Sequence, residues 1–131
     1  MLHAASQADD VSGIRLALQA GKEVDSKDSK VFTPLMVACG HGNVAAARAL
    51  LEAGAALDSK TKDGMTALLY ASAHGQDGAV RALLEAGAAV DSKNNNALTS
   101  LMNASANRHA GTVKILLGAG AAVDLQINKA M

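Results

Sequence analysis

The sequence repeats itself every 33 residues, and this period restricts the fold more than any other feature. The segments 48–60 and 81–93 nearly coincide, reading RALLEAGAALDSK and RALLEAGAAVDSK. A fixed period of about 20–50 residues is typical of solenoids, in which each unit packs only against its neighbours. The residues that recur in step are Thr33, Thr66 and Thr99; Leu2, Leu35, Leu68 and Leu101; Ala5, Ala38, Ala71 and Ala104; Gly21, Gly54, Gly87 and Gly120; and Asp25, Asp58, Asp91 and Asp124.

One unit, residues 61–93, indicates what each repeat should form. Threonine is a favourable N-cap, and glycine permits the left-handed backbone that often ends a helix. No unit can bury its apolar face alone, so neighbouring units must stack. In chain order, the unit has a turn at Asp63-Gly64, a helix near 67–74 that begins at Thr66 and ends at Gly75, and a second helix near 77–86 that ends at Gly87.

The segment Thr33-Pro34-Leu35-Met36-Val37-Ala38 resembles the Thr-Pro-Leu-His-x-Ala pattern of the ankyrin repeat, with Met36 in place of the histidine. His3 keeps that histidine in Leu2-His3-Ala4-Ala5. The Ala-Gly-Ala segments at 53–55, 86–88 and 119–121 look like the segment that ends the family's second helix. The resemblance covers essentially the whole chain. It implies an all-α ankyrin-repeat solenoid of about four stacked helix-turn-helix units with projecting β-turn fingers.

The register of the repeat gives the domain organisation. Residues 1–131 are expected to form a single ankyrin-repeat domain. Met1 aligns with Pro34, so the chain starts inside a repeat and lacks that repeat's first turn. The expected repeats are approximately 1–27, 28–60, 61–93 and 94–126, followed by a tail at 127–131.

Charge and composition exclude several classes of protein. The 12 basic and 12 acidic residues balance, whereas nucleic-acid binding usually needs a concentrated positive field. No apolar stretch approaches the ~18 residues that span a bilayer, and the N-terminus lacks the pattern of a signal peptide. The single cysteine, Cys39, cannot form an internal disulfide. We therefore expect a soluble cytoplasmic protein that binds neither nucleic acid nor membrane.

Few side chains could support chemistry. His41 and His74 lie one repeat apart, on neighbouring helices expected to be roughly 10 Å apart. Cys39 precedes His41 by two residues and should point to a different side of the helix. A zinc site needs four ligands at about 2 Å, which this set does not supply. We expect no catalytic residue, no metal and no cofactor, with both histidines exposed and Cys39 buried.

The recurring aspartates invite a structural interpretation. Asp25, Asp58, Asp91 and Asp124 each lie where a loop begins. Aspartate side chains in such places commonly accept hydrogen bonds from backbone amides. We expect these four carboxylates to bind nearby backbone N–H groups.

The resemblance also implies where a partner binds. Ankyrin arrays use their projecting turns and the exposed side of the first helices, which form a slightly concave surface. The chain has only two aromatic residues, Phe32 and Tyr70, and large amphipathic side chains are frequent in binding hot spots. The expected partner-binding residues are Phe32, Met65 and Leu98 on the turns, Tyr70, His41, His74 and Asn107 on the first helices, and Lys30, Lys62, Asn95 and Asn96 beside them.

Two features of this set leave alternatives open. Phe32, Met65 and Leu98 occupy equivalent places and form an apolar row, which either contacts a partner or only covers the turns. Lysines such as Lys30 and Lys62 either steer an acidic partner or are simply solvated.

The fourth repeat departs most from the pattern. Arg108 stands where Gly42 and Gly75 end the first helix, and a left-handed backbone there would cost about 1 kcal/mol. Gly111 lies early in the second helix, and Ser100 stands where repeat two has a proline. We expect this repeat to fray first.

The last repeat also ends in apolar residues, whereas terminal repeats normally carry a polar outer face. Either the chain is cut from a longer array or this end packs against something. We slightly favour the first explanation and expect a monomer, for which weak self-association through this end is the alternative. The apolar residues are Ile115, Leu116, Leu117, Val123, Leu125, Ile127 and Met131.

The preferred hypothesis is a protein–protein interaction module or adaptor that binds an unidentified protein and catalyses nothing. Alternatives are an engineered or reconstructed repeat scaffold without a natural ligand, and a self-associating fragment of a larger ankyrin array. The near-identical segments 48–60 and 81–93 agree with a scaffold, and equally with duplication. An enzyme or metal protein that uses His41, His74 and Cys39 is a further alternative.

Overall fold

The computed structural model describes residues 1–121, in which the chain forms eight α-helices and no strand. This confirms the all-α repeat fold. The helices expected near 67–74 and 77–86 are α5 and α6. The eight helices are α1 (Leu2–Gln7), α2 (Val11–Gln19), α3 (Pro34–Gly40), α4 (Val44–Glu52), α5 (Ala67–Ala73), α6 (Asp77–Glu85), α7 (Ser100–Ala106) and α8 (Ala110–Gly118).

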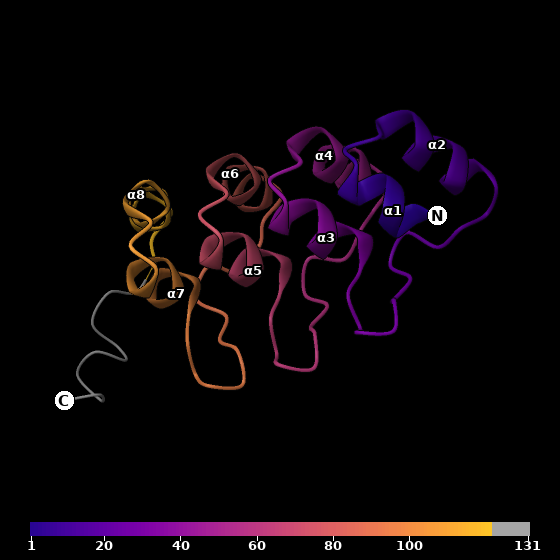
Figure 1. The fold of residues 1–131 in the computed structure, drawn as a ribbon. Coiled ribbons are helices and arrows are strands. Elements are labelled where there is room, and N and C mark those ends of the chain that lie inside the picture. The colour runs from indigo at the N-terminus through magenta and orange to yellow at the C-terminus, as the bar shows by residue number, and fades with distance from the viewer. Residues whose placement is uncertain (122–131) are drawn as a thin grey trace.

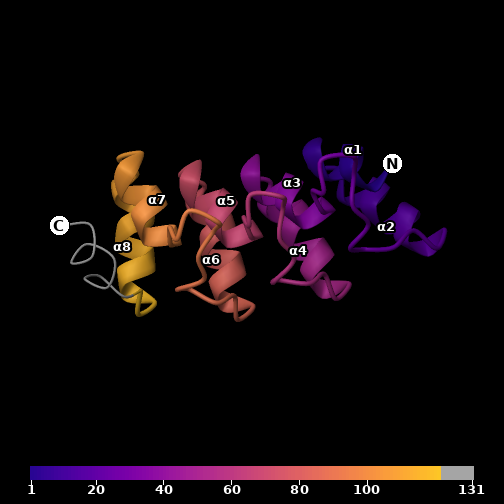
Figure 2. The same ribbon diagram turned by 90° about the horizontal axis from the view of Figure 1, so that it is seen from below.

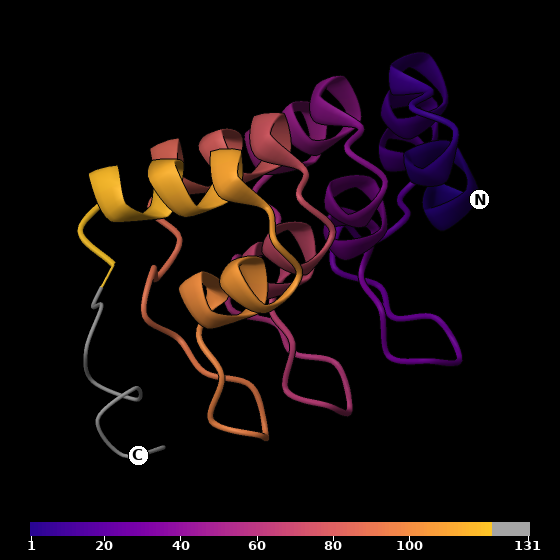
Figure 3. The same cartoon turned by 60° about the vertical axis from the view of Figure 1, so that its left-hand side comes forward.

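The helices pair into four hairpins that stack side by side (Figure 1). The first helices α1, α3, α5 and α7 form one layer, and the second helices α2, α4, α6 and α8 form the other (Figure 2). Each helix packs against its counterpart in the next hairpin. Three loops project beyond the layer of first helices (Figure 3). The stack therefore presents a row of loops beside the first helices, and two ends.

Threonine side chains fix where three of the first helices begin. The hydroxyl oxygens of Thr33, Thr66 and Thr99 accept hydrogen bonds from the backbone N–H three residues later, at 3.3, 3.2 and 3.3 Å. An N-cap of this kind contributes about 1 kcal/mol. The predicted capping role of Thr66 is confirmed.

Leucine and alanine side chains fill a core that runs along the stack. Each leucine that leaves water contributes roughly 1.5–3 kcal/mol, and the small alanines let the helices approach closely. Cys39 lies in this core, as predicted, and burial raises the pKa of its thiol to about 12. Buried members include Leu35, Leu50, Leu68, Leu83 and Leu116, with Ala38, Ala46, Ala71 and Ala104 between them.

Each junction between hairpins carries a side-chain hydrogen bond that closes the end of a first helix. The last carbonyl groups of a helix have no partner within it, so they need one from outside. Asn43, Gln76 and His109, which we call the junction residues, supply it from the following hairpin. The bonds run from Asn43 Nδ2 to the Ser6 and Gln7 oxygens at 2.9 and 2.8 Å, from Gln76 Nε2 to the Gly40 oxygen at 3.1 Å, and from His109 Nε2 to the Ala73 oxygen at 3.1 Å.

Asp25 links two hairpins rather than closing its own loop. Its Oδ1 accepts a hydrogen bond from the backbone N–H of Ala56 at 2.9 Å. The predicted pairing of an aspartate with a backbone amide is therefore correct for Asp25, but the amide belongs to the next hairpin. Asp124 lies outside the described residues.

Within residues 1–121, four residues other than glycine adopt a left-handed backbone. Arg108 has φ of +60°, as expected, and Asp9 has +54° at the equivalent position of the first hairpin. Val31 and Ala97 have φ of +66° and +62° at loop tips, where the middle loop has Gly64. A left-handed backbone costs an L-residue about 1–2 kcal/mol, and it is rarest for β-branched residues such as valine.

The fourth hairpin contains both unfavourable and favourable features. The Ser100 hydroxyl is buried without a hydrogen-bond partner, which costs about 1–3 kcal/mol. Gly111, in contrast, lies against the third hairpin, since a Cβ there would collide with the Asp77 carboxylate. The Thr112 hydroxyl donates a hydrogen bond to the same carboxylate.

The apolar end predicted for the last repeat is only partly correct. The prediction is wrong for Leu116, which is fully buried in the core. Ile115 is half-buried, and Leu117 is 43% exposed. The other residues of that group, Val123, Leu125, Ile127 and Met131, lie outside the described residues.

Replacing Ala97 with glycine should raise the free energy of unfolding by about 0.5–1 kcal/mol, because glycine adopts a left-handed backbone without a steric cost. Ala97 is exposed, so little packing is lost. Urea unfolding followed by circular dichroism measures the change. Ala45→Gly, at an exposed site within α4, is the matched control and should lower stability by about 1 kcal/mol. A loss of stability in both variants would contradict the strain at position 97.

The backbone amides of α7 and α8 are expected to exchange with deuterium before those of α3 to α6. The left-handed Arg108 weakens the fourth hairpin, which has a neighbour on only one side within residues 1–121. Native-state hydrogen exchange measured by mass spectrometry tests this order. Residues 94–121 emerging as the best protected part would show that the expectation is wrong.

Candidate functional site

Three loops, residues 28–32, 61–65 and 94–98, project from the stack, and we call them the fingers. In each, the backbone N–H of the first residue donates to the carbonyl of the fifth at 3.0 Å. The side chain of the first residue accepts a hydrogen bond from the N–H of the fifth. Asp28, Thr61 and Asn94 perform this task, so three different side chains hold the same loop shape.

The first finger is held at its base from two sides. The backbone N–H of Phe32 donates to the Asp28 carboxylate at 2.9 Å, and this bond is the main reason that the pKa of Asp28 is lowered. His3, on α1, donates its Nε2 to the Phe32 carbonyl at 2.7 Å. These bonds fix the backbone that carries the Phe32 ring.

Three rings lie together where the first finger meets α5. The centroids of Phe32 and Tyr70 are 5.2 Å apart in an edge-to-face arrangement, and those of Tyr70 and His74 are 4.6 Å apart. The Tyr70 ring crosses to the second hairpin and lies over Gly40, where a Cβ would collide with it. We call Phe32, Tyr70 and His74 the aromatic cluster. The sequence predicted one face for the two aromatics, and the structure brings them into contact.

The C-terminal ends of the first helices carry a second row of predicted residues. His41, His74 and Asn107 are the C-caps of α3, α5 and α7, and all three are exposed. Each histidine donates its Nδ1 to the carbonyl four residues earlier at 2.9 Å, which leaves Nε2 available for another partner. Asn107 already donates its amide to the Ala73 carbonyl at 3.0 Å.

The predicted asparagines of the third finger differ in their contacts. The side-chain amide of Asn95 donates to the Lys62 carbonyl at 2.8 Å, and its backbone N–H donates to the Asp63 carbonyl at 3.0 Å. It therefore joins the second and third fingers. Asn96 is exposed at the turn of the third finger, and the side chains of Lys30 and Lys62 are exposed on the first two.

The predicted apolar row is not uniform. Phe32 and Met65 are half-buried, and Phe32 packs against the core. Leu98 is 37% exposed. Phe32 and Met65 therefore cover the base of their fingers while still reaching the surface.

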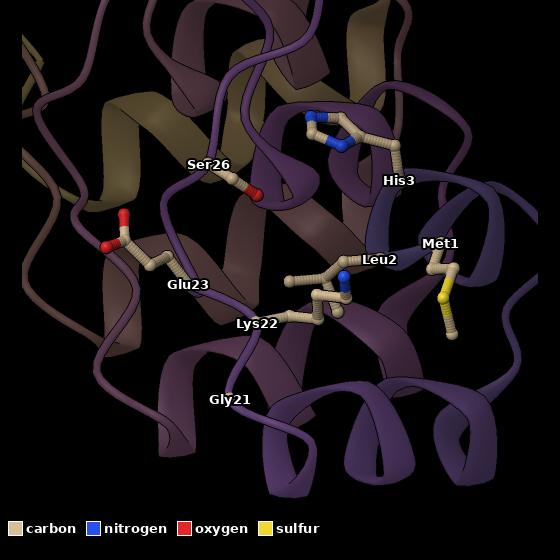
Figure 4. Close-up of a pocket in the computed structure, with 7 residues that line it drawn as sticks. All are labelled: Met1, Leu2, His3, Gly21, Lys22, Glu23 and Ser26. Atoms are coloured by element: carbon tan, nitrogen blue, oxygen red, sulfur yellow. The ribbon is translucent and has the colours of Figure 1, made fainter.

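No cluster suited to metal chemistry occurs in residues 1–121, where no group of three or more histidine, cysteine, aspartate or glutamate side chains could hold an ion. No helix in this part of the chain has the length and apolar character needed to cross a membrane. A hollow of about 290 Å³ lies at the N-terminal end of the stack (Figure 4). It is lined by Met1, Leu2, His3, Gly21, Lys22, Glu23 and Ser26.

Replacing Gly40 with alanine is expected to displace the Tyr70 ring, because the new Cβ would collide with it. Tyr70 is the only tyrosine and the chain has no tryptophan, so near-ultraviolet circular dichroism reports largely on this ring. The signal should fall markedly while the far-ultraviolet helix signal changes little. Ala73→Gly, one repeat further on, is a control that should leave the near-ultraviolet signal in place. An unchanged spectrum for Gly40→Ala would contradict the packing of Tyr70 over position 40.

The comparisons with known proteins agree with this architecture. A family model described as ankyrin repeats (3 copies) matches residues 2–94 and 58–128, which together span nearly the whole chain. A search of curated proteins gave no match. Ankyrin repeats are generally protein–protein interaction modules, and the family is typically not catalytic. With its 33-residue period, paired helices and projecting fingers, the chain belongs to the ankyrin-repeat family.

Proposed function

We propose that this chain is a protein-binding module that holds another protein against its fingers and the adjoining ends of the first helices. The aromatic cluster carries the proposal. The chain has only two aromatic side chains, and both lie in contact at one place on this face. Large aromatic side chains supply much of the binding energy in protein interfaces.

The cluster is organised before any partner arrives. Hydrogen bonds to Asp28 and His3 hold the backbone of Phe32, and Gly40 leaves room for the Tyr70 ring. Side chains that are already fixed lose little conformational entropy on binding, so more of their contact energy contributes to affinity. Phe32 and Tyr70 are half-buried, which leaves part of each ring for a partner.

Polar groups surround the cluster and suit a mixed interface. The Nε2 atoms of His41 and His74 are not used by the bonds that orient their rings. Lys30 and Lys62 are exposed on the neighbouring fingers. This pattern supports a partner that places an apolar side chain on the aromatic cluster and polar or acidic groups around it.

Site-specific photo-crosslinking tests where the partner lies. A photo-reactive amino acid would replace either His74 in the aromatic cluster or Arg81, which is exposed on α6 in the other layer. After incubation with cell lysate, a protein joined from position 74 and not from position 81 supports the proposal. Equal labelling from both positions, or labelling from position 81 alone, would sink the assigned face.

Removal of the Tyr70 ring should weaken binding of the crosslinked protein by about tenfold or more, as expected for a hot-spot residue. Tyr70→Ala and the control Arg81→Ala would be compared by titration of that purified protein, with thermal unfolding as a check that both variants are folded. The control should bind like the original chain. Equal affinity for all three would remove the aromatic cluster from the interface.

A further inference from the structure

The N-terminal end of the stack exposes a position that is covered inside it. Leu16 corresponds by the repeat period to Ala49 and Ala82, which are 8% and 2% exposed. Leu16 is 65% exposed although the second hairpin packs against the first. At Ala49 and Ala82, the cover must therefore come from the preceding hairpin and not from the following one. We call the surface around Leu16 and the α1–α2 turn the N face.

The other end of the stack presents the opposite side of the same kind of junction. Val113 corresponds to Ile14, Ala47 and Val80, which are all 0% exposed. Ile14 is buried in the first hairpin, so the following hairpin covers this position. Val113 is half-buried and lines a hollow of about 450 Å³. The lining, which we call the C face, is Ser105, Arg108, His109, Ala110, Val113 and Lys114.

Arg108 limits what can lie against the C face. It corresponds to Gly42 and Gly75, where a Cβ would collide with the junction residue of the next hairpin, glutamine or histidine. Arg108 has a Cβ, so a hairpin that packs against the C face must carry a residue shorter than glutamine or histidine at the junction position. Asp10 occupies the junction position on the N face and is short enough.

The charges of the two faces are complementary. Three basic side chains, from Arg108, His109 and Lys114, line the C face, and none of its lining residues is acidic. Asp10 is exposed at the N face, where its carboxylate also caps α2 by accepting a hydrogen bond from the Gly13 N–H, whereas Asp9 faces the second hairpin and accepts from the Ala46 N–H. Asp10 cannot donate to a helix-end carbonyl as the other junction residues do, but it can pair with an arginine. Opposite charges also steer association and disfavour contact between two like ends.

The hollow at the N-terminal end matches the same arrangement. Inside the stack, Asp25 of one hairpin accepts a hydrogen bond from the Ala56 N–H of the next. Ala56 corresponds to Glu23, which lines this hollow together with Lys22 and His3 (Figure 4). The backbone N–H of Glu23 therefore occupies the position at which a hairpin that precedes the first one would make this contact.

We propose that the C face of one copy of this chain binds the N face of a second copy, so that the stack continues head-to-tail from one molecule to the next. The occupant of each face is thus a second copy, because the three internal junctions show how such surfaces pack. A head-to-tail contact leaves one face free at each end of the assembly, so it forms open chains that grow with concentration unless the rotation from copy to copy closes a ring. The aromatic cluster and the fingers remain free, and the association does not depend on the proposed partner binding.

Sedimentation equilibrium of the full chain over a range of concentrations tests the association. The average mass should rise with concentration at low ionic strength and fall when salt is added. Leu16→Ala should weaken the association by about tenfold, because it removes an apolar contact. Arg108→Gly should weaken it about threefold through loss of the ion pair, while it relieves the left-handed backbone and raises stability.

Arg81→Ala is the matched control for charge, because Arg81 is exposed on α6 away from both ends. This variant should associate like the original chain. A mass that stays at the monomer value at every concentration would overturn the proposal, and so would association that neither Leu16→Ala nor Arg108→Gly weakens.

Crosslinking between two cysteine variants tests the orientation. One chain carries Gln19→Cys, which is exposed on α2 three residues after Leu16, and the other carries Lys114→Cys on the C face. The native Cys39 is buried with its pKa raised to about 12, so it should not compete for a short bismaleimide. The mixture should give dimers in high yield and each variant alone should give few. Dimers formed equally well by either variant alone would indicate like-end contacts and overturn the head-to-tail arrangement.

Discussion

The junction between successive hairpins is the contact on which the rest of the molecule depends. A single hairpin has two short helices and exposes most of its apolar side chains, so it gains its core only from a neighbour. The junction buries leucine and alanine from both layers, and it also supplies a donor to the open ends of α1, α3 and α5. Apolar burial and polar satisfaction are thus achieved in the same step, which makes the stack cooperative from one hairpin to the next.

The proposed binding surface follows from this cooperation. Phe32 stands on a finger between the first and second hairpins and is tied to α1 through His3, whereas Tyr70 and His74 belong to α5. No single repeat contains the aromatic cluster. Its residues come from two successive repeats and a third hairpin supports it through His3, so the stability of the junctions and the shape of the surface are linked.

The fold could be predicted from the sequence because its signals recur in identical form. The threonine caps and the glycines at helix ends depend on local geometry, and the left-handed backbone at Arg108 followed from its alignment with glycines. The junction residues were missed because asparagine, glutamine and histidine share no pattern, although each donates to the same carbonyl position. Val31 and Ala97 align with Gly64 and are left-handed in the same way, but this follows from the alignment only when the left-handed geometry of the finger is known. For the site, the sequence indicated the face but not the contact between its rings, because a contact across repeats leaves no local signal.

Residues that depart from the repeat pattern indicate properties other than the fold. Gly40 and Tyr70 are unlike their equivalents in neighbouring hairpins, Ala73 and Asn103, and the two departures fit one another because the glycine makes room for the ring. A single altered residue can be accidental, whereas two that are complementary across a junction indicate a shared role. Asp10 and Arg108 form a second pair of departures, one at each end of the stack, with opposite charges. The first pair is joined within the molecule, and the proposed head-to-tail contact would join the second pair between two molecules.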